Sequence, residues 1–172
     1  HYAGYIEDYL KSLEARPGVN PPTAEWQAYA YRKGVFGQWG LIARGPAEAL
    51  PAVLRLLQHP VAEARQAGAG VLEAWTGESG DLEAPALAAA ERELSGPDTD
   101  IETLSTLLGI LGRARSEAAL PLLAGVLRAP ESSVGDLDWS AVEALQAIAG
   151  QRFVHESDPK QAADQWLRER GL

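Results

Sequence analysis

The sequence predicts an all-α protein in which pairs of helices repeat along the chain. Three helical segments each carry a proline, and Pro51, Pro85 and Pro121 lie 34 and 36 residues apart. Each segment is followed by a turn, a second stretch with helical apolar spacing, and a closing glycine, at Gly77, Gly112 and Gly150. Helix pairs that recur at this period bury a continuous core only by stacking on one another. We therefore expect a right-handed α-α superhelix of about four helix pairs, closed at its C-terminal end by a capping helix.

The composition predicts a soluble chain with its own core. The 172 residues fit a single domain, 1–172, and the 46% of hydrophobic residues suffice to build its interior. No stretch approaches the roughly 20 apolar residues of a membrane span. Cysteine is absent, which excludes disulfides and thiolate metal sites and favours a cytoplasmic location. The net charge of −9 argues against a nucleic-acid partner and suits a basic protein partner.

An aromatic-rich helix pair is expected in residues 1–45, before the three proline-bearing pairs. Its first helix carries Tyr2, Tyr5 and Tyr9 at helical spacing. Its second helix is expected to end at Gly45. The three later pairs are expected at 46–77, 81–112 and 116–150.

The later helices have recognisable ends. Pro46 stands in a first turn, where a missing N–H is harmless, and Thr99 and Glu102 have capping-box spacing. Asp158, followed by Pro159, is the expected N-cap of the last helix. These signals and the apolar spacing predict helices at 46–57, 61–75, 82–94, 100–111, 116–128, 138–149 and 158–170.

The proline-bearing pairs resemble HEAT repeats. The similarity is closest over residues 50–77, where the segment HPVAEAR stands in place of the family's Asp, short turn, apolar residue and Arg. His59 occupies the position of the usual Asp, and neither later pair has an Arg at the position of Arg65. The resemblance covers residues 46–150. It implies an α-solenoid whose second helices line a concave binding face, with candidate contacts at Gln38, Gln66, Glu73, Glu102, Thr103, Thr106, Glu143 and Gln146.

Two Asp-x-Asp segments fall in equivalent turns of adjacent pairs and form the first candidate site. They contain Asp98 with Asp100, and Asp136 with Asp138. One explanation is helix capping, in which Asp100 and Asp138 are the N-caps and the other two aspartates interact with the positive helix ends. The alternative is an acidic rim for a basic partner, or a divalent-cation site.

A second candidate surface lies in the aromatic N-terminal quarter. Most of its aromatic residues have helical spacing and are expected in the core. Tyr31, Arg32 and Lys33 are harder to bury together. Exposed aromatic and arginine side chains are typical of interaction hot spots, which makes this segment a candidate partner-binding surface.

The sequence contains no catalytic, metal or cofactor motif. His59 and His155 have no companion at ligand spacing. The pattern therefore favours a non-enzymatic protein-interaction module for a protein partner, such as an immunity-type binder of a basic toxin. The alternative is a catalytic or accessory subunit of a HEAT-like lyase-type enzyme. A buried pocket with a perturbed carboxylate would favour that alternative, and an open groove would favour the binding module.

Overall fold

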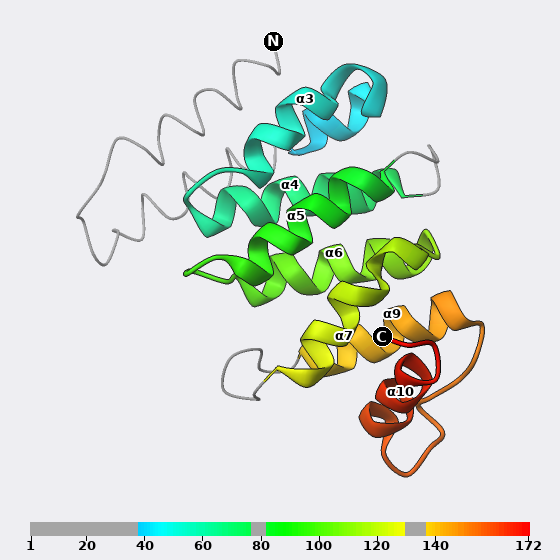
Figure 1. Ribbon diagram of the computed structural model, residues 1–172. Coiled ribbons are helices and arrows are strands. Elements are labelled where there is room, and N and C mark those ends of the chain that lie inside the picture. The colour runs from blue at the N-terminus through cyan, green and yellow to red at the C-terminus, as the bar shows by residue number, and fades with distance from the viewer. Residues whose placement is uncertain (1–37, 77–81, 130–136) are drawn as a thin grey trace. The chain divides into compact units, whose positions relative to one another are not determined.

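The computed structural model describes residues 38–76, 82–129 and 137–172, and every regular element within these ranges is helical (Figure 1). The predicted all-α class is therefore confirmed. The contacts divide the chain into two compact units, residues 1–75 and 76–172. After a helical segment at 38–44, the elements are α3 (Pro46–Leu57), α4 (Ala62–Trp75), α5 (Glu83–Ser95), α6 (Ile101–Arg113), the 3-10 helix η1 (Glu117–Ala119), α7 (Leu120–Arg128), α9 (Leu137–Ala149) and α10 (Pro159–Arg168).

In the first unit, α3 packs against α4 around a core of aliphatic side chains. Val53 of α3 and Leu72 of α4 are completely buried. Gly68 allows the close approach, because a Cβ at this position would lie 3.0 Å from the Leu57 Cγ atom. The buried Trp75 indole donates a hydrogen bond of 3.2 Å to the Ile42 carbonyl, which joins α4 to the helical segment before α3.

The turn between α3 and α4 is held by two side chains. Arg65, which is only 8% exposed, donates from Nη1 to the carbonyls of Pro60 at 2.8 Å and His59 at 3.2 Å. The His59 Nδ1 atom accepts a hydrogen bond of 3.2 Å from the Val61 backbone N–H. An Asp side chain makes the same local bond to a backbone N–H two residues on. His59 therefore takes the structural part that an aspartate could play in this turn.

In the second unit, helices of successive pairs pack on one another. Helix α6 contacts both its partner α5 and the next second helix, α9. Helix α10 packs against both α7 and α9 (Figure 1). The interior is mostly aliphatic, and its completely buried side chains include Leu104, Leu107, Leu108, Leu111, Leu123 and Leu145.

The three recurring prolines occupy different places in their helices. Pro85 is the third residue of α5 and Pro121 the second of α7, so both lie in first turns where no intrahelical N–H bond is lost. Pro51 lies inside α3 and removes the bond to the carbonyl of Ala47. Ala47 itself is exposed. Of the three recurring prolines, only Pro51 therefore removes a hydrogen bond from the interior of its helix.

Gly112 does not end its helix as predicted. Helix α6 continues to Arg113, and Arg115 takes the left-handed conformation with φ of 52°. The Arg115 N–H donates to the Gly112 carbonyl and the Ser116 N–H to the Leu111 carbonyl, both at 3.0 Å. This is the Schellman arrangement with arginine in the position where glycine is usual. Gly112 is instead a packing residue.

Gly45 and Gly150 do end helices as predicted. Gly45 has φ of 73° and Gly150 has φ of 65°, in the left-handed region that favours glycine. Gly77, the third predicted closing glycine, lies outside the described residues.

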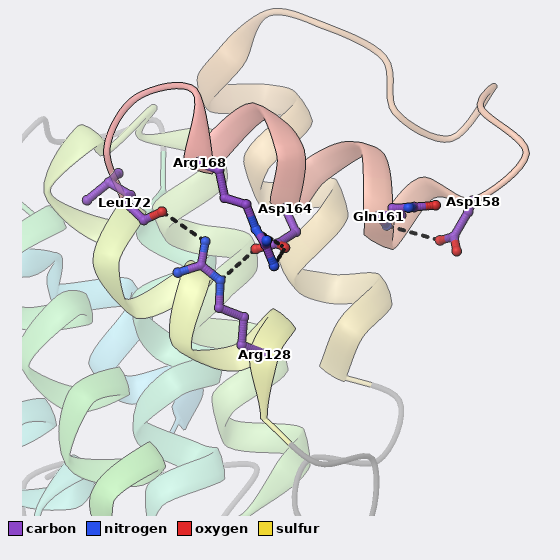
Figure 2. Close-up of polar contacts among 6 residues, drawn as sticks. All are labelled: Arg128, Asp158, Gln161, Asp164, Arg168 and Leu172. Carbon is purple, nitrogen blue, oxygen red and sulfur yellow. Dashed lines mark hydrogen bonds and ion pairs between the residues drawn. The ribbon is translucent and has the colours of Figure 1, made fainter.

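An ionic cluster of Arg128, Asp164 and Arg168 joins α10 to α7 (Figure 2). Asp164 accepts a hydrogen bond of 2.6 Å from Arg128 Nε and one of 2.8 Å from Arg168 Nε. Partial burial alone would raise the pKa of Asp164, but the hydrogen bonds and charges of Arg128 and Arg168 outweigh it and lower the pKa. The carboxylate therefore remains ionised at neutral pH. Asp158 caps the helix as predicted, accepting a hydrogen bond of 3.0 Å from the Gln161 backbone N–H.

Candidate functional site: the groove between α6 and α9

Helices α6 and α9 approach closely because small side chains meet between them. A Cβ on Gly112 would lie 2.8 Å from the Cα atom of Ala144, a distance that real Cβ atoms do not reach. Nearer the start of both helices, the hydroxyl oxygens of Ser105 and Ser140 are 2.8 Å apart and share a hydrogen bond. These two contacts fix which residues of α6 face which residues of α9.

A half-open groove of about 230 Å³ runs along this helix pair. Six of its lining residues are small, and Arg113 and Glu143 are the two charged ones. A Cβ on Gly109 would meet the Arg113 Nη1 atom at 3.7 Å, so the guanidinium lies next to this glycine. The lining residues are Ser105, Gly109, Gly112, Arg113, Ser140, Glu143, Ala144 and Ala147.

Two large apolar side chains are exposed on the two helices that form the groove. Trp139 is 52% exposed and Ile101 is 44% exposed. Ile101 is one helical turn before Ser105, and Trp139 is one turn before Glu143, so each shares a helix face with a lining residue. Both apolar residues lie near the N-terminal ends of their helices. The contact between Ser105 and Ser140 brings these two ends together. The Trp139 Nε1–H donates a hydrogen bond of 3.0 Å to Glu143 Oε1.

The structure confirms Asp100 as an N-cap but does not form the capping box predicted between Thr99 and Glu102. The Asp100 Oδ2 atom accepts a hydrogen bond of 2.8 Å from the Thr103 N–H. The predicted reciprocal partner, Glu102, is exposed. Glu93 of the preceding helix acts instead, because its buried carboxylate accepts a hydrogen bond of 2.6 Å from the Asp100 N–H. Thr99, predicted as the capping hydroxyl, donates to the Glu93 carbonyl.

Asp138 is not the N-cap that the sequence predicted. Helix α9 begins at Leu137, so Asp138 lies inside the first turn. Its Oδ2 atom forms an ion pair of 2.6 Å with Lys160 Nζ of α10. The prediction failed because Lys160 is 22 residues further along the chain and its approach depends on how α10 packs.

Among the remaining predicted site residues, only Asp98 lies in the described part of the chain. Asp98 is exposed in the turn before α6. Asp136, Tyr31, Arg32 and Lys33 lie outside the described residues. The acidic rim and the N-terminal hot spot therefore remain predictions.

Replacing Asp100 by alanine should lower the free energy of unfolding by about 0.5–2 kcal/mol, because a helix N-terminal N–H loses its acceptor. The matched control is Glu102→Ala, which would cost a similar amount if the predicted capping box existed. We expect the control to change stability by no more than about 0.5 kcal/mol. Urea unfolding followed by circular dichroism measures both, and equal losses would contradict the observed capping arrangement.

Most of the groove was missed by sequence reasoning. Among the predicted contacts on the second helices, only Glu143 lines it. Thr103 is buried, and the Gln146 Oε1 atom accepts a hydrogen bond of 2.9 Å from the Val154 N–H, so it has a structural role. One signal was available: Ile101, Ser105, Gly109 and Arg113 recur every four residues, so two small residues separate an apolar one from a charged one along one side of α6.

Comparison of the chain with models of protein families, with curated proteins and with solved structures found no match. In the part of the chain that the structure describes, no three His, Cys, Asp or Glu residues gather at a possible metal site. No helix of that part has the length and apolar character needed to cross a membrane.

Proposed function

We propose that this protein is a non-enzymatic interaction module of the HEAT-repeat type, and that it binds a protein partner along the groove between α6 and α9. The observation that carries the proposal is a half-open groove between two second helices, with the exposed indole of Trp139 bonded to its lining residue Glu143. Tryptophan is enriched among the residues that dominate binding energy at protein interfaces.

Two observations support a repeat architecture of the HEAT kind. The turn after α3 is organised by Arg65 and His59, the positions on which the resemblance rests. In the second unit, α9 packs directly on α6, as stacked repeats require. We propose that this stacking continues as a right-handed solenoid whose second helices form the binding face. The lack of cysteine suits a cytoplasmic setting.

The groove favours binding over catalysis. A lyase-type enzyme needs a site that excludes water around its reacting groups. This groove is half open, and Glu143, its lining carboxylate, is exposed. The alternative of a catalytic or accessory enzyme subunit therefore receives less support than a docking surface.

Site-specific photocrosslinking tests the proposal. A photoreactive benzophenone side chain would replace Ala147, which is exposed and lines the groove. The matched control places the same group at Glu91, which is exposed on α5. In an extract of the source cells we expect a discrete crosslinked protein from position 147 only, competed by unlabelled wild-type protein.

The captured protein is then purified and its affinity measured. We expect Trp139→Ala to weaken binding about tenfold or more, as for an interface hot spot. Identical crosslinks from both positions, or an unchanged affinity of the Trp139→Ala variant, would contradict the proposal.

A further inference from the structure

Trp139 and Glu143 form an aromatic and acidic corner beside the groove. They are one helical turn apart on α9, and the indole N–H holds the Glu143 carboxylate at 3.0 Å. The indole is 52% exposed, so a partner can reach it. A cation that stacks on an indole ring gains from the negative face of the ring. A carboxylate at the ring edge can accept hydrogen bonds from the same cation, and such charge-assisted bonds are stronger than neutral ones.

Elsewhere in the fold, this chain already stacks arginine on tryptophan. The Arg170 guanidinium lies 3.6 Å from the centroid of a Trp166 ring. Its Nη1 atom also donates to the Trp166 carbonyl at 3.3 Å. The guanidinium thus combines ring stacking with a directed hydrogen bond. Trp139 and Glu143 present the same two kinds of contact on an accessible surface.

We propose that Trp139 and Glu143 bind an arginine side chain of the partner, with the guanidinium stacked on the indole and donating to the carboxylate. This inference rests on the proposed function and names the chemistry that the groove recognises. Arginine fits better than lysine, because its planar group can stack and donate at the same time. The net charge of −9 favours the approach of a basic segment.

The charges of the groove also orient the segment. Arg113 follows Gly112, whose close contact with Ala144 lies further along both helices than the Ser105 and Ser140 contact. Arg113 therefore comes from the C-terminal end of α6, and its guanidinium lies beside Gly109, about two helical turns from Ile101. A partner arginine is favoured at Trp139 and disfavoured beside Arg113. Between them, the small lining residues leave room for small partner side chains.

Nuclear magnetic resonance with a defined peptide tests the arginine site. The probe is acetyl-Gly-Ala-Arg-Ala-Gly-amide, and its matched control carries Gln in place of Arg. The chain has five tryptophans, and the indole N–H signals of Trp139 and Trp39 are assigned from the Trp139→Phe and Trp39→Phe variants. Trp39 is 67% exposed in the other unit and serves as the internal control.

We expect the arginine peptide to shift the Trp139 signal and to bind at least about fivefold more tightly than the glutamine peptide. Added salt should reduce this preference. Glu143→Gln keeps an acceptor for the indole but removes the charge, and should abolish most of the preference. Glu91→Gln removes an equal charge from α5 and should leave the preference unchanged.

Equal binding of the two peptides, or equal shifts of Trp39 and Trp139, would overturn the arginine site. A captured partner whose affinity falls with Trp139→Ala but is unaffected by Glu143→Gln would also overturn it, while the proposed interaction module would stand. If both variants lose partner binding and keep an intact fold by circular dichroism, the result supports the interaction module as well as the arginine site.

Discussion

Leu108→Ala is expected to lower the free energy of unfolding by about 2–5 kcal/mol. Leu108 is completely buried in α6. Helix α6 packs against both α5 and α9, so a cavity in α6 weakens a helix that takes part in both of these packing contacts. The loss combines the missing transfer free energy with the cost of that cavity. Urea unfolding followed by circular dichroism gives the value directly.

The matched control is Leu87→Ala, the same change on α5, where the side chain is only half-buried. Less apolar surface returns to water there, and neighbouring solvent can fill the space. We expect a clearly smaller loss, about 1 kcal/mol. Equal losses at the two positions, or a change at Leu108 within about 0.5 kcal/mol, would contradict the assignment of Leu108 to the core.

Helices could be predicted from the sequence because their signals are local. Pro46 and Gly45 set the start of α3, and Asp158 with Pro159 sets the start of α10, within a few residues of chain. Asp100 was recognised as a cap for the same reason. The reciprocal part of that cap was not, because Glu93 belongs to the preceding helix and its place is decided by the packing of α5 on α6.

The groove could not be predicted because it depends on the register between two helices. Ser105 and Ser140 are 35 residues apart, and no sequence pattern around either one predicts that the two are in contact. An apolar residue such as Trp139 is expected in the core, so its exposure could not be predicted. In the structure, Ala141, Val142 and Leu145 of α9 fill the core and Trp139 faces solvent. Sequence periodicity identifies the buried face of a helix, but it does not say which exposed residues of two helices meet.

Gly112 and Gly109 give the second large prediction, because they are one turn apart on α6 but differ in surroundings. A Cβ at Gly112 would lie 2.8 Å from the Ala144 backbone and 3.2 Å from its Cβ, so α6 and α9 would have to move apart. A Cβ at Gly109 would meet only the flexible end of Arg113, at 3.7 Å. Both changes to alanine gain the same helix propensity, so their difference isolates the cost of the clash.

We expect Gly112→Ala to lower the free energy of unfolding by about 1–3 kcal/mol, the usual cost of overpacking. Gly109→Ala should raise it by about 0.5–1 kcal/mol, since alanine lowers the entropy of the unfolded chain without strain. Urea unfolding of both variants measures the two values. If Gly112→Ala were as stable as Gly109→Ala, α6 and α9 would not be in tight contact, and the groove that depends on their register would lose its basis.

A stable Gly109→Ala variant with weakened partner binding would place the partner against the lining of the groove, because the added methyl group occupies that surface alone.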